Sequence, residues 1–282
     1  MPQLRVLVLN NTIDRPGQPW TTAAMSEEIV SAILACKTIE RLEMASATDP
    51  IHCLDFARLS QGSESLKSLY LAAGTRVDRE GSRAALNVPF QATVFPRLQR
   101  LTLGCRTTGI MPNVISRMGG EDVNAIASLG RIDVRFWVST WSNQCITFLS
   151  QQGPYLHTFE WAIPPEPHVT LLGAMTGVKT LIIPYRTLVC VSGSLGGPMP
   201  NLELVVIRPD RLSHYAEANH IACLTLIPAI LAMGNPKLSC IRLDGDLDTF
   251  KRIFPGLLDA SVEGDLDRAG VTLLCGESEV EW

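Results

Sequence analysis

The sequence predicts an α/β solenoid, in which short strand–loop–helix units follow one another and their strands stack into a parallel sheet. Three observations support this prediction. The same pattern of three apolar positions returns along the whole chain of 282 residues. Proline stands two positions before several copies of the pattern, and the segments between copies have the apolar periodicity of helices. Since no single unit can bury its apolar face alone, the core must come from the stacking of neighbours.

The repeated pattern is apolar-x-x-apolar-x-apolar. The nine copies are Leu4-Leu7-Leu9, Ile39-Leu42-Met44, Leu66-Leu69-Leu71, Leu98-Leu101-Leu103, Leu129-Ile132-Val134, Leu156-Phe159-Trp161, Val178-Leu181-Ile183, Leu202-Val205-Ile207 and Leu238-Ile241-Leu243. Their starting positions differ by about 29 residues on average, a period that is typical of solenoids.

Proline is the more specific signal. It stands two positions before five of the nine copies, at Pro2, Pro96, Pro154, Pro200 and Pro236. With 18 prolines in the chain, chance would place fewer than about one there. Proline cannot continue a helix and cannot donate a hydrogen bond inside a sheet, so it marks the point where a helix ends and a strand begins.

The segments between the copies predict helices. Residues 21–36 combine a threonine N-cap with apolar residues on one face. Residues 216–236 have a similar apolar face and reach Gly234, a typical C-cap. Pro228 inside this run predicts a kink or two shorter helices. Residues 247–259 predict a further helical turn or two.

Composition restricts the class of protein. Apolar residues make up 46% of the chain, charged residues 18%, and the net charge is -4, which offers no footprint for nucleic acid. Residues 1–13 lack the basic and apolar regions of a signal peptide. The most apolar window, residues 221–233, is shorter than the roughly 20 residues that span a bilayer. We therefore expect a cytoplasmic or nuclear protein that binds neither nucleic acid nor a membrane.

The long, irregular repeats and their Pro-x-Leu-x-x-Leu openings resemble the repeat regions of F-box/leucine-rich-repeat proteins, notably the large fungal sets of them. The likeness covers about residues 2–275. The family's Asn or Cys, which follows the third leucine after two further residues, is replaced here, for example by Thr12, Ala47 and Gly74. The F-box is also absent, because the first repeat begins at Leu4.

The resemblance implies a leucine-rich repeat solenoid, curved into a horseshoe with the parallel sheet on its concave face and the helices outside. It implies a single domain over residues 1–282, with about nine or ten irregular repeats. An ordinary doubly wound α/β domain also alternates strands and helices, and it remains the alternative. Such a domain would carry glycine-rich phosphate loops after some of its strands.

The sequence contains no constellation that carries catalysis. The glycine-rich residues 192–198 match neither the dinucleotide-binding fingerprint nor the P-loop. Residues 244–248 resemble half of a calcium loop, but Thr249 and Pro255 stand where such a loop needs glycine and a bidentate acid. No histidines and cysteines have the spacing of a zinc site. We expect no enzyme activity, no cofactor and no metal.

Side chains alternate along a strand, so the residue between the second and third apolar positions points outward. In chain order this predicted row is Val8, Glu43, Tyr70, Thr102, Asp133, Glu160, Ile182, Val206 and Arg242. An adjacent outward row holds Arg41, Arg100 and Arg131, so the signs are mixed and simple polyanions are not expected ligands. Tyr70 is the expected aromatic anchor, and Ile182 with Val206 the expected exposed apolar pair. The candidate partner-binding residues are Tyr70, Ile182, Val206, Glu43, Asp133 and Glu160.

These features favour a non-catalytic scaffold that binds a partner protein through its concave face. The first alternative is a substrate receptor of a cullin-type ubiquitin ligase whose F-box is missing from this chain; it would bind a ligase adaptor if an F-box lies upstream. The second alternative is an enzyme on an α/β fold.

Overall fold

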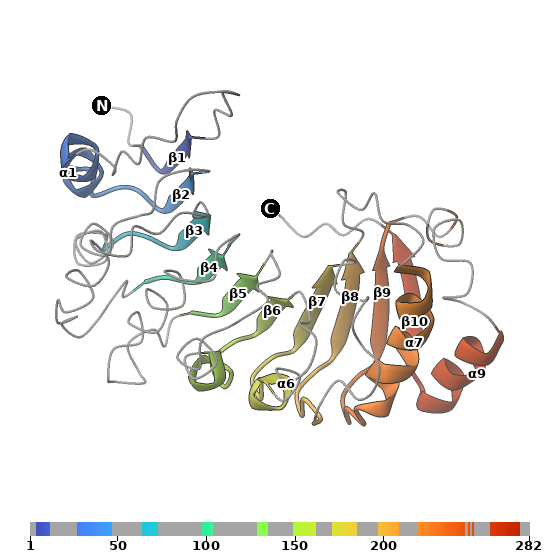
Figure 1. Ribbon diagram of the computed structural model, residues 1–282. Coiled ribbons are helices and arrows are strands. Elements are labelled where there is room, and N and C mark those ends of the chain that lie inside the picture. The colour runs from blue at the N-terminus through green and yellow to red at the C-terminus, as the bar shows by residue number, and fades with distance from the viewer. Residues whose placement is uncertain are drawn as a thin grey trace, which may run out of the picture. The chain divides into compact units, whose positions relative to one another are not determined.

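A computed structural model describes residues 4–11, 27–46, 64–72, 97–103, 129–134, 149–161, 171–184, 197–208, 219–245, 248, 250 and 260–276 (Figure 1). The chain forms two compact units, residues 1–155 and 156–282, and each contains a parallel sheet. The prediction of a single domain over residues 1–282 stays a prediction.

The first unit contains five strands whose order in the sheet is their order in the chain. They are β1 (Val6–Asn11), β2 (Arg41–Ser46), β3 (Ser68–Ala72), β4 (Arg100–Leu103) and β5 (Arg131–Val134). Every neighbouring pair is parallel, and the second apolar positions are partners from strand to strand: Leu7, Leu42, Leu69, Leu101 and Ile132. The predicted register of these repeats is therefore confirmed.

The second unit has the same arrangement. Its strands are β6 (Thr158–Trp161), β7 (Thr180–Pro184), β8 (Leu204–Arg208), β9 (Cys240–Asp244) and β10 (Thr272–Gly276). The second positions again pair in order: Phe159, Leu181, Val205, Ile241 and Leu273. Together the two units confirm the predicted α/β repeat fold.

Strand β10 is a tenth repeat that the pattern search did not include. The first apolar position of this repeat is Val271, which is buried and lies just before the strand. It stands two positions before Leu273, whereas in the preceding repeat Leu238 stands three positions before Ile241. A glycine C-cap of the helix before it, Gly270 with a φ of 66°, occupies the position where the pattern requires an apolar residue. The irregular helix end therefore hides this repeat from the pattern.

The backbone repeats as regularly as the side chains. In the first unit, the N–H groups of Glu40 and Arg41 both donate to the carbonyl of Arg5, at 2.8 and 3.0 Å. The N–H groups of Lys67 and Ser68 both donate to Glu40 in the next repeat. In the second unit, Thr180 and its predecessor share the carbonyl of His157 in the same way, and this pairing recurs at the start of β8 and β9. Each repeat thus begins its strand from the same point of the preceding one.

The core includes the first and second apolar positions of most repeats and, in the second unit, the third positions Ile183, Ile207 and Leu243. At the first position, Leu66, Leu98, Leu129, Leu156, Val178 and Leu202 are at most 1% exposed. Leu4 is 47% exposed, because β1 lies at the end of the strand order of its unit and no described strand covers its outer side. The first apolar position is thus buried in the repeats inside the stack and exposed at β1.

The described helices are α1 (Glu27–Ala35), α6 (Leu171–Ala174), α7 (Asn219–Ala232) and α9 (Ala260–Ala269). Helix α1 confirms the predicted helix within residues 21–36. Pro228 predicts a kink or two shorter helices; α7 continues through it as one element, so the second alternative is wrong and the kink stays a prediction. Gly234, with a φ of 66°, follows the end of α7 as predicted. Most of residues 247–259 lie outside the described part of the chain.

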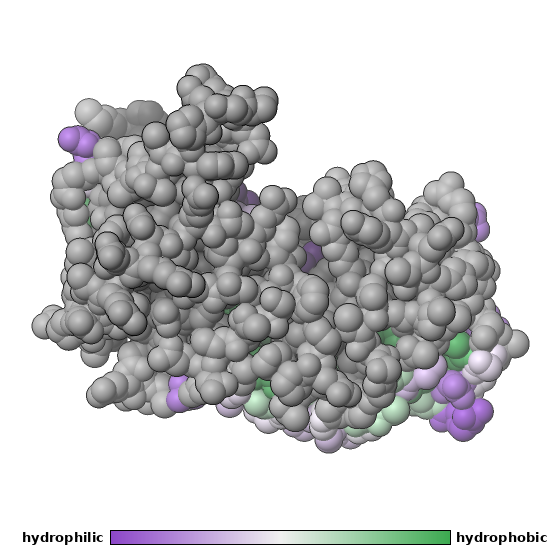
Figure 2. All heavy atoms as spheres, viewed as in Figure 1, coloured by the Kyte–Doolittle hydropathy of each residue, from purple (hydrophilic) through white to green (hydrophobic). Residues whose placement is uncertain are grey.

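Helix α9 was not predicted. It buries Val262 and Leu266, contacts α7 and β10, and exposes Glu263 and Arg268. Figure 2 shows hydrophilic residues gathered on the surface in this region. The N–H of Val271 donates to the carbonyl of Leu266 at 3.0 Å, which closes the helix after Gly270.

The register predicts that alanine substitutions at two nearby positions, one in β4 and one just before it, lower the free energy of unfolding by very different amounts. Leu101 is 0% exposed, so Leu101→Ala should lower the free energy of unfolding by about 2–5 kcal/mol. Gln99→Ala, at an exposed position two residues earlier, should lower it by less than about 0.5 kcal/mol. Urea unfolding of both variants measures the difference, and equal losses would contradict the assigned register.

Repeat stacking also predicts tolerance of truncation. Deletion of residues 1–38 removes β1 and α1 but leaves the pairing of β2 with β3 intact. Because stability in a stack is a sum of neighbour contacts, the remainder should stay folded at a lower urea midpoint. Circular dichroism provides the measurement. A complete loss of the folded signal would favour the ordinary α/β domain instead.

Candidate functional site

The outward residues of the strands form a continuous row in each unit. In the first unit the register pairs Val8, Glu43, Tyr70, Thr102 and Asp133 in sequence. In the second unit it pairs Glu160, Ile182, Val206, Arg242 and Leu274. We call these residues the strand row. The register confirms the predicted neighbours and adds Leu274 of β10.

The exposure of the strand row differs from the expectation. Ile182 and Val206 are each 1% exposed, so the prediction of an exposed apolar pair is wrong. Arg208, at the end of β8, reaches across β7 to Glu160, over the part of the row that holds Ile182. Thr102, which was also expected to face solvent, is 3% exposed. The buried members of the row are therefore Thr102 and Asp133 in the first unit and Glu160, Ile182 and Val206 in the second.

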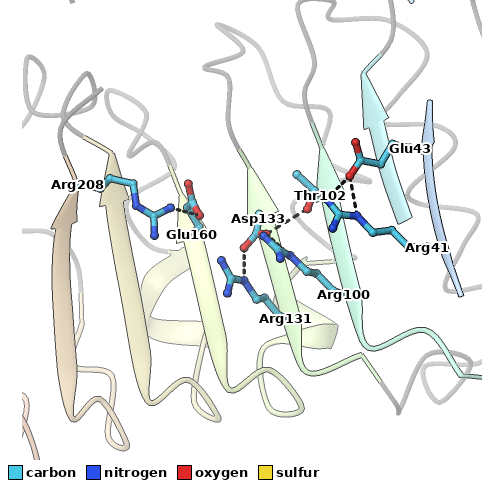
Figure 3. A network of polar contacts seen from close by, with 8 residues as sticks. All are labelled: Arg41, Glu43, Arg100, Thr102, Arg131, Asp133, Glu160 and Arg208. Atoms are coloured by element: carbon cyan, nitrogen blue, oxygen red, sulfur yellow. Dashed lines mark hydrogen bonds and ion pairs between the residues drawn. The ribbon is translucent and has the colours of Figure 1, made fainter. Parts of the chain in front are cut away.

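Asp133 is the centre of the polar network in the first unit (Figure 3). Its side chain is 0% exposed and accepts hydrogen bonds from Arg100 Nε at 2.8 Å, Arg131 Nε at 2.6 Å and Thr102 Oγ1 at 3.1 Å. Arg100 and Arg131 are partners in the register of β4 and β5. Two guanidinium groups can lie side by side here because one buried carboxylate stands between them.

Glu43 and Arg41 form a separate pair on β2. Arg41 Nε donates to Glu43 Oε1 at 2.7 Å, and both side chains retain contact with solvent. Tyr70 lies next to Glu43 in the row and is half-buried. These residues, unlike Asp133, are accessible to another molecule.

Arg208 has the corresponding role in the second unit. Its Nη1 donates to Glu160 Oε2 at 3.1 Å, and its Nε donates to Asp244 Oδ2 at 2.9 Å. One guanidinium thus joins β6, β8 and β9 by contacts that are mostly buried. Asp244 opens the segment that resembled half of a calcium loop, and this ion pair gives it a structural role.

Cys240 and Arg242 lie on the same side of β9, because they are two residues apart. Burial raises the pKa of the Cys240 thiol above its usual value, and the Arg242 guanidinium lowers it by less. The thiol therefore stays protonated at neutral pH and is a poor nucleophile. It offers no support for covalent catalysis.

Exposed ion pairs line the start of the strands. Lys67 Nζ lies 3.0 Å from Glu40 Oε2, and this hydrogen bond and charge lower the pKa of the Glu40 carboxyl. Lys179 lies 3.8 Å from Glu203, with both side chains more than half exposed. Such pairs contribute little to stability because water and salt screen them.

Two searches of the described residues returned no candidates. No group of three or more His, Cys, Asp or Glu is placed to hold a metal ion there. In the same ranges, no helix has the length and apolar character needed to cross a membrane.

No protein-family model matches the chain, and no curated protein matches it. Among solved structures it is similar to an internalin from Listeria monocytogenes, with 13% identity and a TM-score of 0.33. The match covers 89% of this chain and 66% of the internalin. The in-register parallel strands carry the assignment of the architecture. The chain has a leucine-rich repeat fold.

The network around Asp133 predicts a specific loss of stability. Asp133→Ala removes the buried carboxylate that both Arg100 and Arg131 contact, so it should lower the free energy of unfolding by about 3–5 kcal/mol. The control Glu203→Ala removes an exposed pair with Lys179 and should cost at most about 1 kcal/mol. Urea unfolding checks both values. Equal small losses would mean that the Asp133 network is not a major determinant of stability.

Proposed function

We propose that the chain is a non-catalytic scaffold that binds a partner protein through the outward side chains of its strands. One observation carries the proposal: these side chains stand in register on neighbouring strands, and ion pairs between strands hold several of them in place. Parallel strands lie about 4.8 Å apart, so they present a surface of fixed spacing. A surface that is ordered before binding loses less side-chain entropy on association.

The candidate residues have different roles in this proposal. Tyr70 and Glu43 are accessible and are the proposed contacts with the partner. Asp133 and Glu160 are buried and would act by holding arginine side chains in position. Burial removes the reason for assigning Ile182 and Val206 as contacts with the partner.

The role of a ubiquitin-ligase receptor rests on the resemblance to F-box/leucine-rich-repeat proteins. A receptor of that kind binds a ligase adaptor through its F-box. Co-purification of such an adaptor with the natural, full-length gene product would support this role. A cytoplasmic or nuclear location belongs to the same proposal.

Site-specific photo-cross-linking tests the proposed face. A cross-linking residue at position 70 should capture a discrete partner, whereas one at position 28, on an exposed side of α1, should not. With the captured partner, Tyr70→Ala should weaken binding about tenfold or more, as truncation of an aromatic anchor does. Unchanged affinity, with a folded variant by circular dichroism, would contradict the role of Tyr70.

A further inference from the structure

Five arginines lie on the strands that the structure describes, and four of them have a carboxylate partner. Arg41 contacts Glu43, Arg100 and Arg131 contact Asp133, and Arg208 contacts both Glu160 and Asp244. Arg242 of β9 is the exception: within the described ranges no residue accepts a hydrogen bond from its buried Nε. Among the arginines of the described strands, Arg242 is therefore the one whose side chain forms no ion pair with a carboxylate of the described residues.

The surroundings of Arg242 explain why its charge is uncompensated. Its register neighbours are apolar: Val206 on β8, which is buried, and Leu274 on β10, which is 49% exposed. Along β9 its neighbours on the same face are Cys240 and Asp244. The Asp244 carboxylate accepts a hydrogen bond from Arg208 Nε at 2.9 Å. The Glu160 carboxylate, on β6, accepts one from Arg208 Nη1 at 3.1 Å. Two arginines, Arg208 and Arg242, thus lie near two carboxylates, but both of these carboxylates form their ion pairs with Arg208.

We propose that Arg242 binds a carboxylate of the partner protein, with Leu274 as the adjoining apolar contact. The inference rests on the proposed function and assigns it a position and a chemistry. A guanidinium pairs with a carboxylate through two parallel hydrogen bonds. Because no carboxylate of the described residues already pairs with the Arg242 guanidinium, a carboxylate of the partner gains more there than at a paired arginine. The partner segment therefore carries Asp or Glu beside an apolar residue.

The chain contains one competing source of carboxylates. Residues 277–282, directly after β10, include Glu277, Glu279 and Glu281. If this segment were the natural occupant of Arg242, its removal would expose the site. The experiment must therefore distinguish a partner from the chain's own segment.

A display library of random linear peptides is the probe. Selection on the wild-type protein should enrich peptides with an acidic residue next to an apolar one. The selected peptide should bind Arg242→Gln about ten- to a hundredfold more weakly, and its own acid-to-amide variant should lose a similar factor on the wild type. The control Arg268→Gln, on the exposed face of α9, should bind as the wild type does.

Four results would overturn the inference. They are failure to enrich acidic peptides, equal binding to Arg242→Gln, binding that appears only after deletion of residues 277–282, and a urea midpoint lowered as much by Arg242→Gln as by Arg208→Gln. The last result would show a structural role for Arg242. Loss of binding in Tyr70→Ala but not in Arg242→Gln would retain the proposed face while rejecting this site. Insensitivity to both substitutions would reject the face itself.

Discussion

The stacking of one buried apolar position on the next is the constraint on which the whole structure depends. Leu42, Leu69 and Leu101 are partners in the register and are at most 1% exposed. A shift of one residue between two strands would turn every inward side chain to the other face. The core therefore fixes the register, and the register decides which outward residues become neighbours.

This constraint has a cost on the outward face. Parallel strands in register place equivalent positions side by side, so a repeated arginine meets another arginine. Arg100 and Arg131 are such a pair. Asp133, two residues after Arg131, forms an ion pair with each of them and so reduces the repulsion between their charges. In the second unit Arg208 joins three strands through two carboxylates. The outward face of each unit is thus arranged by electrostatics within limits that the apolar core sets.

The pattern of apolar residues was sufficient to predict nine strands, their order and their register, because the apolar positions of one repeat stack on those of the next in one alignment only. It was not sufficient for the tenth repeat, where the Gly270 helix cap displaces the first apolar residue to Val271. Nor did it predict the burial of Ile182. Nor did it predict the ion pair between Arg208 and Glu160, which are 48 residues apart in the chain. Contacts of this range depend on side-chain length and direction, which a strand pattern does not encode.

The same reasoning gives meaning to an arginine that lacks a partner. A charge that is withdrawn from water is stable in a protein only where its hydrogen bonds are met, and the mostly buried Arg100, Arg131 and Arg208 follow this rule. Arg242 departs from it on a face that is otherwise paired. The apolar core dictates that position 242 faces outward, but it does not dictate an arginine there, because threonine and valine occupy equivalent positions in Thr102 and Val206. The apolar core therefore does not account for the charge at position 242, and the proposed partner carboxylate is what would compensate it.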